Sequence, residues 1–521
     1  MKGKSARFLI SVVFILFFSG IINAQATTEA LPRSTPEKEG VSSKGILNFL
    51  DAIEKSNHEF HSFMFLRHGK VISEGWWKPY SPERKHTMYS LSKSFTSTAI
   101  GFAVSEKRLT VNDRVISFFP KELPDSISPN LASLRIKDLL SMSAGQDPEP
   151  TFSVSAKDSN WVKILLSLPI VHKPGTKFLY NTLATYMLSA IIQKVTKEKV
   201  VDYLRPRLFE PLGIHGMDWE TDPMGINLGG WGLRIKTEDM AKFGQFYLQK
   251  GNWKGHQILP KEWIEEATTK KIDQSPEASQ SKRDSSDWLQ GYCYQFWRCR
   301  YNAFRGDGAY GQFIIVMPEQ DAVVVITAES NNLQDEINLV WKYLLPAITN
   351  KELPADNKEA KALKEKLSTL SLPIAPKSAD PATISAISGK IFATEKNDNG
   401  IQSLSFKFNN GTCQLIIKSD TAEYKINFSS GVWNFGETSM RGPDLFPDAK
   451  THLAEFAHSK IAGSYNWKDE KTLELTLRYI ESPHTERITC HFSDNKILVE
   501  IQKSSESKTK KAEIKGEIKQ F

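Results

Sequence analysis

Apolar residues in the first part of the chain recur mainly at helical spacing, with two short alternating runs between them. Residues 46–53 carry apolar side chains at the first, fourth, fifth and eighth positions, which predicts an amphipathic helix. Residues 62–67 and 71–76 flank a His-Gly-Lys turn and predict a β-hairpin. A second helical pattern, over residues 91–102, follows the hairpin.

The next two hundred residues continue mainly in helical patterns. Turns rich in proline, asparagine and glycine separate them, so we expect short helices joined by tight connections. The segments with apolar positions at helical spacing are residues 111–119, 136–142, 161–168, 183–195 and 240–250.

The pattern changes to strands towards residue 300. We predict three strands of one sheet over residues 292–297, 313–317 and 322–327. The last two are almost continuously apolar, which indicates that both faces of the sheet are covered. A helix over residues 335–345 is expected to close this unit.

The last third of the chain has a different character. Residues 350–386 are rich in Lys, Ala and Pro with one short amphipathic stretch, and we interpret them as a linker. From residue 387 to 521, short alternating runs are separated by turns such as Asn409-Asn410-Gly411, which predicts a small antiparallel β domain, either a sandwich or a barrel.

The N-terminus has the order of a secretory signal. Basic residues come first, then an apolar run from Phe8 to Ile22, then small residues. We therefore predict a signal peptide over residues 1–24, a mature domain over 25–349, and an exported protein, periplasmic or extracellular. The alternative is a permanent N-terminal anchor helix, but the apolar run of about fifteen residues is shorter than the roughly twenty that a membrane span needs, so we expect no stable span after signal removal.

Composition narrows the functional classes. The formal net charge is +7 and spread along the chain apart from a Lys-rich end, so no nucleic-acid partner is expected. The four cysteines permit the pairs Cys293–Cys299 and Cys413–Cys490 in an exported protein, but their spacing cannot fix connectivity. Neither a Cys-x-x-Cys pair nor a His-Glu-x-x-His helix occurs, so we predict no metal site and no cofactor.

The candidate chemistry begins with Ser-x-x-Lys, a pattern with five copies in the chain. Four copies lie in polar, Lys- and Ser-rich surroundings. Only Ser90 opens an apolar helical segment, in which Lys93 would be desolvated one turn away on the same face. A lysine that loses its proton there can activate a serine, although serine is also a common helix N-cap.

Four stretches in order resemble the serine hydrolases built on the penicillin-binding-protein and class C β-lactamase fold, a group that includes esterases, D-aminopeptidases and 6-aminohexanoate-dimer hydrolases. The resemblance covers residues 39–348 and implies an α/β (α+β) fold: an antiparallel sheet flanked by helices, with an inserted helical subdomain and the site between them. The matching stretches are residues 89–95, 136–145, 174–180 and 308–312.

The resemblance implies roles for particular residues. Ser90 would be the nucleophile, with Lys93 and Tyr180 as the proton-transfer pair. The oxyanion hole would be formed by the backbone N–H groups of Ser90 and Ala309. Taken alone, a tyrosine such as Tyr180 beside an apolar helix is more often a core aromatic.

The substrate-binding positions depart from the family pattern. The second motif of the family is Tyr-x-Asn, but here Thr182 stands in the third position and Asn181 lies one position early. The hydroxyl of Thr182 can form a hydrogen bond, but it cannot act as the amide that holds a β-lactam or a peptide in the family. The third motif aligns with Gly306-Asp307-Gly308 and lacks the leading cation, which argues for an uncharged ester or amide. Asp307 is also a plausible turn former. A glycine pair, Gly229 and Gly230, would allow close backbone approach at the rim.

The sequence therefore predicts an exported serine hydrolase that acts on a small molecule or a short peptide, with its oligomeric state left open. A D,D-peptidase or other penicillin-recognising enzyme is one alternative, and a catalytically silent binding protein with the same fold is another. A Ser-His-Asp hydrolase is disfavoured because the chain has no Gly-x-Ser-x-Gly elbow.

Overall fold

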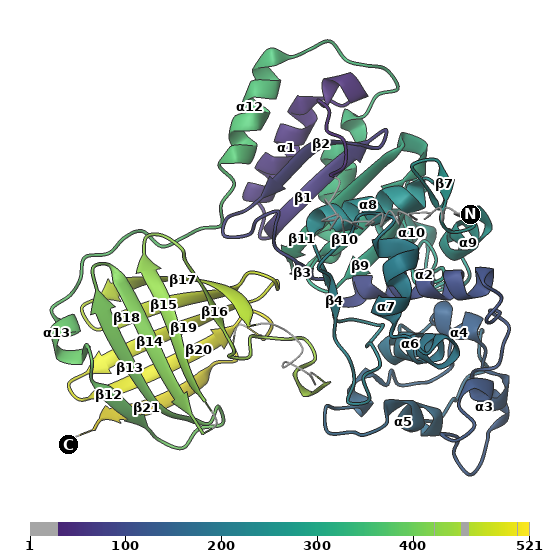
Figure 1. The fold of residues 1–521 in the computed structure, drawn as a ribbon. Coiled ribbons are helices and arrows are strands. Elements are labelled where there is room, and N and C mark those ends of the chain that lie inside the picture. Colours follow the sequence, from purple (N-terminus) through teal and green to yellow (C-terminus); the bar gives the residue numbers. More distant parts are fainter. Residues whose placement is uncertain (1–29, 421, 450–457, 508, 520–521) are drawn as a thin grey trace, which may run out of the picture.

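A computed structural model describes residues 30–420, 422–449, 458–507 and 509–519. It has an α/β unit with a helical subdomain beside it, followed by a separate β-barrel (Figure 1). The expected signal peptide, residues 1–24, lies outside the described residues.

The α/β unit is organised around a six-stranded antiparallel sheet with the strand order β2-β1-β11-β10-β9-β8. The expected hairpin is confirmed, and the apolar strands β10 and β11 are buried almost throughout. The strand bounds are β1 Glu59–Arg67, β2 Lys70–Trp76, β8 Trp297–Arg298, β9 Phe304–Gly308, β10 Gln312–Met317 and β11 Ala322–Glu329.

Helices cover both faces of this sheet, as the continuous apolar runs predicted. Along β1, Met64 and Leu66 join one hydrophobic cluster and Phe63 and Phe65 join the other, because successive side chains of a strand point to opposite faces. The first cluster contains residues of α2 (Ser92–Ser105) and α8 (Thr237–Leu248). The second contains residues of α1 (Ser43–Glu54), α11 (Leu333–Leu339) and the π-helical turn η7 (Val340–Leu344).

The helical subdomain lies on the far side of α2 from the sheet (Figure 1). Residues 92–103 of α2 are therefore buried on every face, although the sequence pattern predicts a single apolar stripe. The subdomain comprises α3 (Pro129–Ser133), α4 (Ile136–Leu140), α5 (Trp161–Ser167), α6 (Thr182–Thr196) and α7 (Val200–Leu204).

Smaller elements complete this part of the chain. A three-stranded sheet with the order β3-β5-β4 lies beside the start of α2. Its strands are β3 (His86–Thr87), β5 (Leu233–Ile235) and β4 (Asp218–Trp219), and the remaining elements are the hairpin β6 (Asn252–Trp253) and β7 (His256–Gln257), α9 (Lys261–Thr268) and α10 (Gln280–Ser285).

One strand prediction is wrong. Within residues 292–297 only Trp297 joins the sheet, as the first residue of the two-residue strand β8, and Tyr292 forms isolated bridges with Ile272 and Trp297. The longer strand between β8 and β10 is β9, residues 304–308. Its sequence, Phe-Arg-Gly-Asp-Gly, has low intrinsic strand preference because two of its five residues are glycine. Pairing with β10 and close packing against the start of α2 form the strand instead.

The segment interpreted as a linker contains a packed helix, α12 (Asn357–Ser368). Lys366 near its end lies 3.1 Å from Asp51 of α1, and Leu370 packs directly over Gly75 of β2. The first part of residues 350–386 therefore belongs to the cover of the sheet, and Figure 1 shows an extended connection after it.

The C-terminal β domain is a barrel, which decides between the two architectures expected from sequence. A parallel pairing of Ser429 with Ser464 joins β15 to β17 and closes the sheet. The elements are α13 (Thr383–Ile387), β12 (Ile391–Thr394), β13 (Ile401–Asn409), β14 (Thr412–Ser419), β15 (Glu423–Ser430), β16 (Asn434–Thr438), β17 (Ser459–Asp469), β18 (Thr472–Tyr479), β19 (Thr485–Ser493), β20 (Lys496–Lys503) and β21 (Ala512–Ile518).

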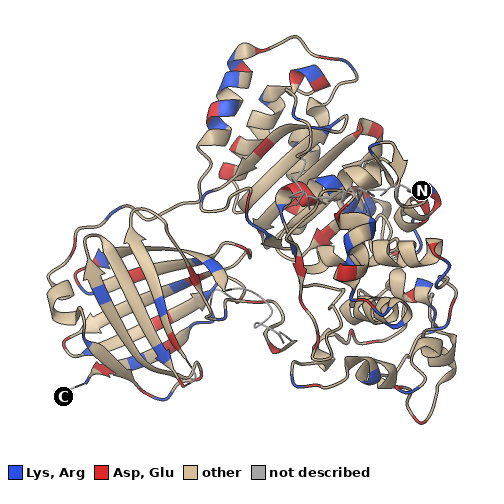
Figure 2. Cartoon of the chain, viewed as in Figure 1, with Lys and Arg blue, Asp and Glu red and all other residues tan. Residues whose placement is uncertain are grey.

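All four cysteines are buried free thiols, so neither of the disulfides that the sequence permits is formed. In the part of the chain that the structure describes, no helix is long and apolar enough to cross a bilayer. Lys and Arg are interspersed with Asp and Glu over both parts of the molecule (Figure 2).

Candidate active site

Ser90 lies in a short 3₁₀ turn, Tyr89–Leu91, that leads directly into α2. Strand β9 approaches this turn at two glycines. A Cβ atom on Gly308 would lie 2.1 Å from the Met88 carbonyl oxygen, and one on Gly306 would lie 2.6 Å from a methyl group of Leu91. Only glycine permits so close an approach, so these two residues bring the edge of the sheet against the turn that carries Ser90.

Lys93 is buried, with 2% of its surface exposed, and its amine faces Ser90. The Nζ atom lies 2.9 Å from Ser90 Oγ, 2.8 Å from the Gly230 carbonyl oxygen and 3.4 Å from Thr182 Oγ1. Burial lowers the pKa of Lys93 to about 7, against smaller opposing effects of Glu149 and Asp307. A pKa in this range leaves part of the amine neutral at neutral pH and able to accept a proton.

Tyr180 lies on the other side of this amine, with its ring centroid 4.9 Å from Lys93 Nζ. Burial raises the pKa of Tyr180 well above its ordinary value, the charge of Asp307 adds to this, and the hydrogen-bonding hydroxyl of Ser90 opposes it. The phenol therefore stays protonated at neutral pH. It is suited to donate a proton, whereas Lys93 is suited to accept one.

Thr182 and Asn181 have different environments although they are adjacent. The hydroxyl oxygen of Thr182 accepts a hydrogen bond from Lys93 Nζ. Asn181 is buried at the N-cap of α6, where its Oδ1 accepts from the Ala184 N–H at 3.0 Å and its Nδ2 donates to Gln146 at 2.6 Å. Its amide is used within the protein, so the substrate-binding role expected for Asn181 finds no support in this geometry.

Gly229 and Gly230 lie under the lysine. The Gly230 carbonyl accepts from Lys93, and the Gly229 carbonyl accepts from Thr96 of α2 at 2.9 Å. A Cβ on Gly230 would lie 2.6 Å from the Thr182 carbonyl oxygen. The pair is buried between α2 and α6, where the Gly230 carbonyl helps to position the Lys93 amine. From the sequence, these glycines were expected at the rim of the site.

Asp307 lies on the same face of β9 as Arg305, and the two side chains form an ion pair, with Arg305 Nη2 2.9 Å from Asp307 Oδ2. Both are almost completely buried. The guanidinium carbon lies 4.1 Å from the ring centroid of Trp288 and 5.4 Å from that of Trp297. A cation is thus present two residues before Asp307, but this carboxylate neutralises it.

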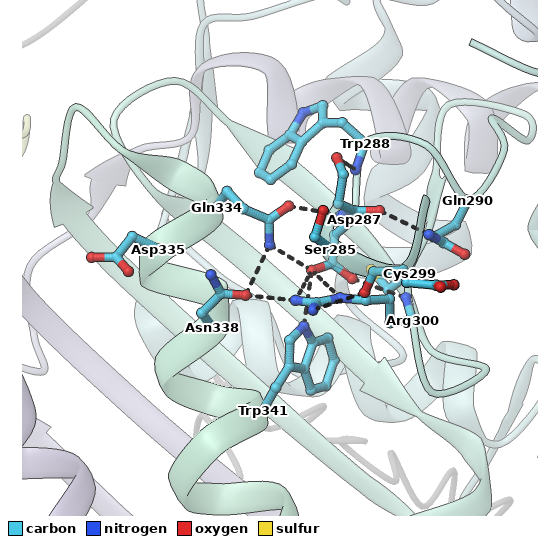
Figure 3. Close-up of polar contacts among 12 residues, drawn as sticks. Ser285, Asp287, Trp288, Gln290, Cys299, Arg300, Gln334, Asp335, Asn338 and Trp341 are labelled. Atoms are coloured by element: carbon cyan, nitrogen blue, oxygen red, sulfur yellow. Dashed lines mark hydrogen bonds and ion pairs between the residues drawn. The ribbon is translucent and has the colours of Figure 1, made fainter. Parts of the chain in front are cut away.

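A second carboxylate fixes the loop that supports Arg305. Asp287 is buried and accepts hydrogen bonds from Arg300 at 2.8 Å, Gln334 at 2.7 Å and the Trp341 indole at 3.0 Å (Figure 3). Its backbone carbonyl accepts from Arg305 Nη1 at 2.9 Å. The network holds the loop before β8 to helix α11, and it thereby orients the guanidinium that pairs with Asp307.

Ala309 follows Gly308 at the end of β9, next to the Ser90 turn. Its carbonyl accepts from the Gln312 side chain at 3.0 Å, which directs this carbonyl towards β10. The two residues predicted for the oxyanion hole thus lie on the two segments that Gly308 brings together.

Sequence reasoning missed three contributors to this site. Glu149 accepts from the Thr182 N–H at 3.1 Å and raises the pKa of Lys93, but nothing in its local sequence marks it. Arg305 could have been found had residues 304–308 been assigned as a strand, because alternate residues share a face. Trp297 stacks on Tyr180 at 5.6 Å and belongs to the segment that was assigned as a strand.

A serine beside a buried lysine and a tyrosine, where an antiparallel sheet meets a helical subdomain, defines the class of penicillin-recognising serine hydrolases and their relatives. The chain belongs to this family. A family model described as "Beta-lactamase" matches residues 61–345, more than half of its 521 residues.

Individual relatives agree with this placement. The chain is 24% identical over 283 residues to the "6-aminohexanoate-dimer hydrolase" of Paenarthrobacter ureafaciens, covering 51% of this chain and 71% of the relative. It is 29% identical over 143 residues to a "Putative D-alanyl-D-alanine carboxypeptidase" of Salmonella paratyphi B, covering 25% of this chain and 33% of that protein.

The fold agrees with a solved structure, described as "Putative 6-aminohexanoate-dimer hydrolase from Bacillus anthracis". The TM-score is 0.50 at 22% identity, covering 63% of this chain and 89% of the other. The likeness supports the hydrolase fold of the α/β unit.

Proposed function

We propose that this protein is an exported serine hydrolase that cleaves an uncharged ester or amide through an acyl-enzyme on Ser90. The observation that carries the proposal is the contact between the hydroxyl of Ser90 and the buried amine of Lys93 at 2.9 Å. With a pKa of about 7, this amine is a base matched to neutral pH.

In the proposed mechanism, neutral Lys93 removes the Ser90 proton as Oγ attacks the carbonyl carbon. The resulting oxyanion is stabilised by the backbone N–H groups of Ser90 and Ala309. The protonated amine and the phenol of Tyr180 then return a proton to the leaving group. Water attacks the acyl-enzyme by the reverse proton path, which restores Ser90.

Charge supports an uncharged substrate. The cation nearest to the third motif, Arg305, is neutralised by Asp307, and the aromatic rings of Tyr180, Tyr292 and Trp297 pack beside this ion pair. A substrate carboxylate at this position would have to compete with Asp307 for the guanidinium. A neutral acyl or leaving group would not compete with Asp307 for this guanidinium.

A fluorophosphonate probe tests the proposal. We expect the intact wild-type protein to gain the mass of one phosphonyl adduct and the Ser90→Ala variant to gain none. Ser279→Ala is the matched control, because Ser279 opens another Ser-x-x-Lys sequence at an exposed helix cap, and it should label like the wild type. Absence of an adduct on the wild type at neutral pH would overturn the proposal and favour the silent binding protein.

A substrate panel then separates the enzyme classes. We expect neutral p-nitrophenyl esters or neutral amides to be turned over faster than either nitrocefin or a peptide ending in D-Ala-D-Ala. Preference for the carboxylate-bearing peptide would favour the D,D-peptidase alternative instead.

A further inference from the structure

The barrel contacts the α/β unit through the turn between β18 and β19, residues 480–484. In this turn, the Glu481 carbonyl accepts from the Thr87 N–H at 3.0 Å, and the Ser482 carbonyl accepts from the Tyr80 hydroxyl at 3.1 Å. Thr87 lies three residues before Ser90. A segment from the far end of the chain therefore packs against the strand that enters the nucleophile turn.

His484, the last residue of this turn, is completely buried and hydrogen-bonded on both ring nitrogens. Its Nδ1 lies 2.7 Å from Glu329 Oε1 at the end of β11, and its Nε2 lies 2.5 Å from the hydroxyl of Tyr89. A carboxylate only accepts hydrogen bonds, so Nδ1 donates to Glu329, and in the tautomer that this contact selects Nε2 accepts from the phenol.

Tyr89 is the residue immediately before Ser90. It has a φ of 46°, in the left-handed region that a bulky side chain rarely adopts, and 2% of its surface is exposed. Burial raises the pKa of Tyr89 well above its ordinary value, so the phenol keeps the proton that it donates to His484. The hydrogen bond to His484 and a backbone hydrogen bond from Leu445 hold the phenol, and the surroundings thereby support a backbone conformation that a bulky residue rarely adopts.

The same imidazole also contacts Tyr310, the residue that follows Ala309 of the predicted oxyanion hole. The ring of Tyr310, the residue after Ala309, stands perpendicular to His484 at 4.7 Å and lies 5.6 Å from Tyr89. Tyr310 is also in the left-handed region, with a φ of 66°. One side chain from the barrel therefore touches both strained residues that flank the reaction centre.

We infer that His484 is a positioning residue for catalysis, which holds the backbone N–H groups of Ser90 and Ala309 in their working orientation through Tyr89 and Tyr310. This inference rests on the proposed function of Ser90. The barrel is also attached to the α/β unit by the ion pair of Arg478 with Glu59. Attachment of the barrel alone therefore does not account for the buried imidazole of His484.

Two substitutions of nearly equal size separate the two contacts of the imidazole. In His484→Gln the amide reaches the place of Nε2, so its oxygen still accepts from Tyr89. In His484→Asn the shorter amide reaches only the place of Nδ1 and faces Glu329. We expect His484→Asn and Tyr89→Phe to lower kcat for a neutral ester at least about tenfold with KM nearly unchanged, and His484→Gln to keep most of the rate.

A readout that needs no activity accompanies the kinetics. Hydrogen exchange of the peptide containing Ser90 should accelerate in His484→Asn and stay near the wild-type rate in His484→Gln. His491→Ala, a change at a partly exposed histidine of β19, is the control and should alter neither measurement.

The outcomes distinguish the two proposals. A wild type that takes up no fluorophosphonate overturns the function proposed for Ser90, while the exchange data still decide whether His484 fixes the turn. Equal rates and equal exchange in the Asn and Gln variants, whether both are unchanged or both are impaired, would overturn the role of His484, because a structural role alone does not discriminate between the two amides.

Discussion

A Lys93→Met variant should unfold at a higher temperature than the wild-type protein and yet fail to acylate Ser90. The two side chains have similar length and volume, so packing around α2 should be retained. The change removes the amine that lies 2.9 Å from Ser90 Oγ, and it also removes a buried positive charge.

The size of the effect follows from the pKa of Lys93, which burial lowers from 10.5 to about 7. Each pH unit corresponds to about 1.4 kcal/mol, so keeping this amine buried costs the folded state about 4 kcal/mol at about pH 7. Loss of the hydrogen bond to the Gly230 carbonyl offsets about 1–3 kcal/mol of that gain. The remainder, about 1–3 kcal/mol, corresponds to a rise in Tm of roughly 2–6 °C.

The sign of the pH dependence provides the test. The pKa of Lys93 is lower in the folded state than in the unfolded chain, so the destabilisation is full below about pH 7 and disappears as the pH rises towards about 10.5. Calorimetry should therefore show the advantage of Lys93→Met shrinking between about pH 7 and about pH 10. A variant that melts below the wild type by the same margin at both pH values would refute the reasoning.

A second buried lysine supplies the control. Lys242 of α8 is also buried, its amine donates to the Gly213 carbonyl at 2.8 Å, and burial lowers its pKa as well. Lys242→Met should change stability with the same sign of pH dependence and leave acylation of Ser90 intact. The comparison separates loss of the base from loss of a buried charge.

Further outcomes follow from the same geometry. The rate of Ser90 phosphonylation should rise about tenfold per pH unit below about pH 7 and level off above about pH 8, as Lys93 becomes neutral. In Asp307→Asn the midpoint of this pH profile should move to lower pH, because the Asp307 carboxylate raises the pKa of Lys93. The same change removes the ion-pair partner of Arg305, so the ratio of kcat/KM for carboxylate-bearing esters to that for neutral esters should increase. Gly308→Ala should lose at least about a hundredfold in kcat/KM, since its Cβ would displace the strand that leads to Ala309, the residue proposed for the oxyanion hole. Arg478→Ala should cost about 1–3 kcal/mol, because it leaves the partly exposed Glu59 without this partner, and in calorimetry it should separate the barrel transition from that of the α/β unit.

Much of the fold could be predicted from the sequence because its elements follow local periodicity. The hairpin, the apolar strands β10 and β11 and the helix after Ser90 all have patterns of period two or 3.6 that decide which face is buried. Strand β9 has no such pattern. Its two glycines allow the strand to pack closely against Leu91 and Met88. The local sequence preference of the strand carries no information about these distant neighbours.

The site was predictable to a smaller extent. The motifs predicted Ser90, Lys93 and Tyr180, and the structure brings these three side chains together, while their catalytic roles stay a prediction. The position of Asn181 beside a motif suggested contact with substrate. In the structure its side chain caps the N-terminus of α6 by accepting from the Ala184 N–H. Glu149 and His484 reach their partners only through tertiary folding, because Glu149 lies 33 positions from Thr182 and His484 lies 395 positions from Tyr89, and no local periodicity connects residues so far apart.

The distance in sequence between Tyr89 and His484, 395 positions, also has a meaning in time. A ribosome that adds about 5–20 residues per second needs roughly 20–80 s to travel from one to the other. During that interval the growing chain already carries Ser90 and Lys93 but lacks His484, the residue that we propose holds the turn of residues 89–91. Hydrolytic competence would then be acquired last, with the final hairpins of the barrel, and a prematurely terminated chain would carry the nucleophile without becoming an efficient enzyme.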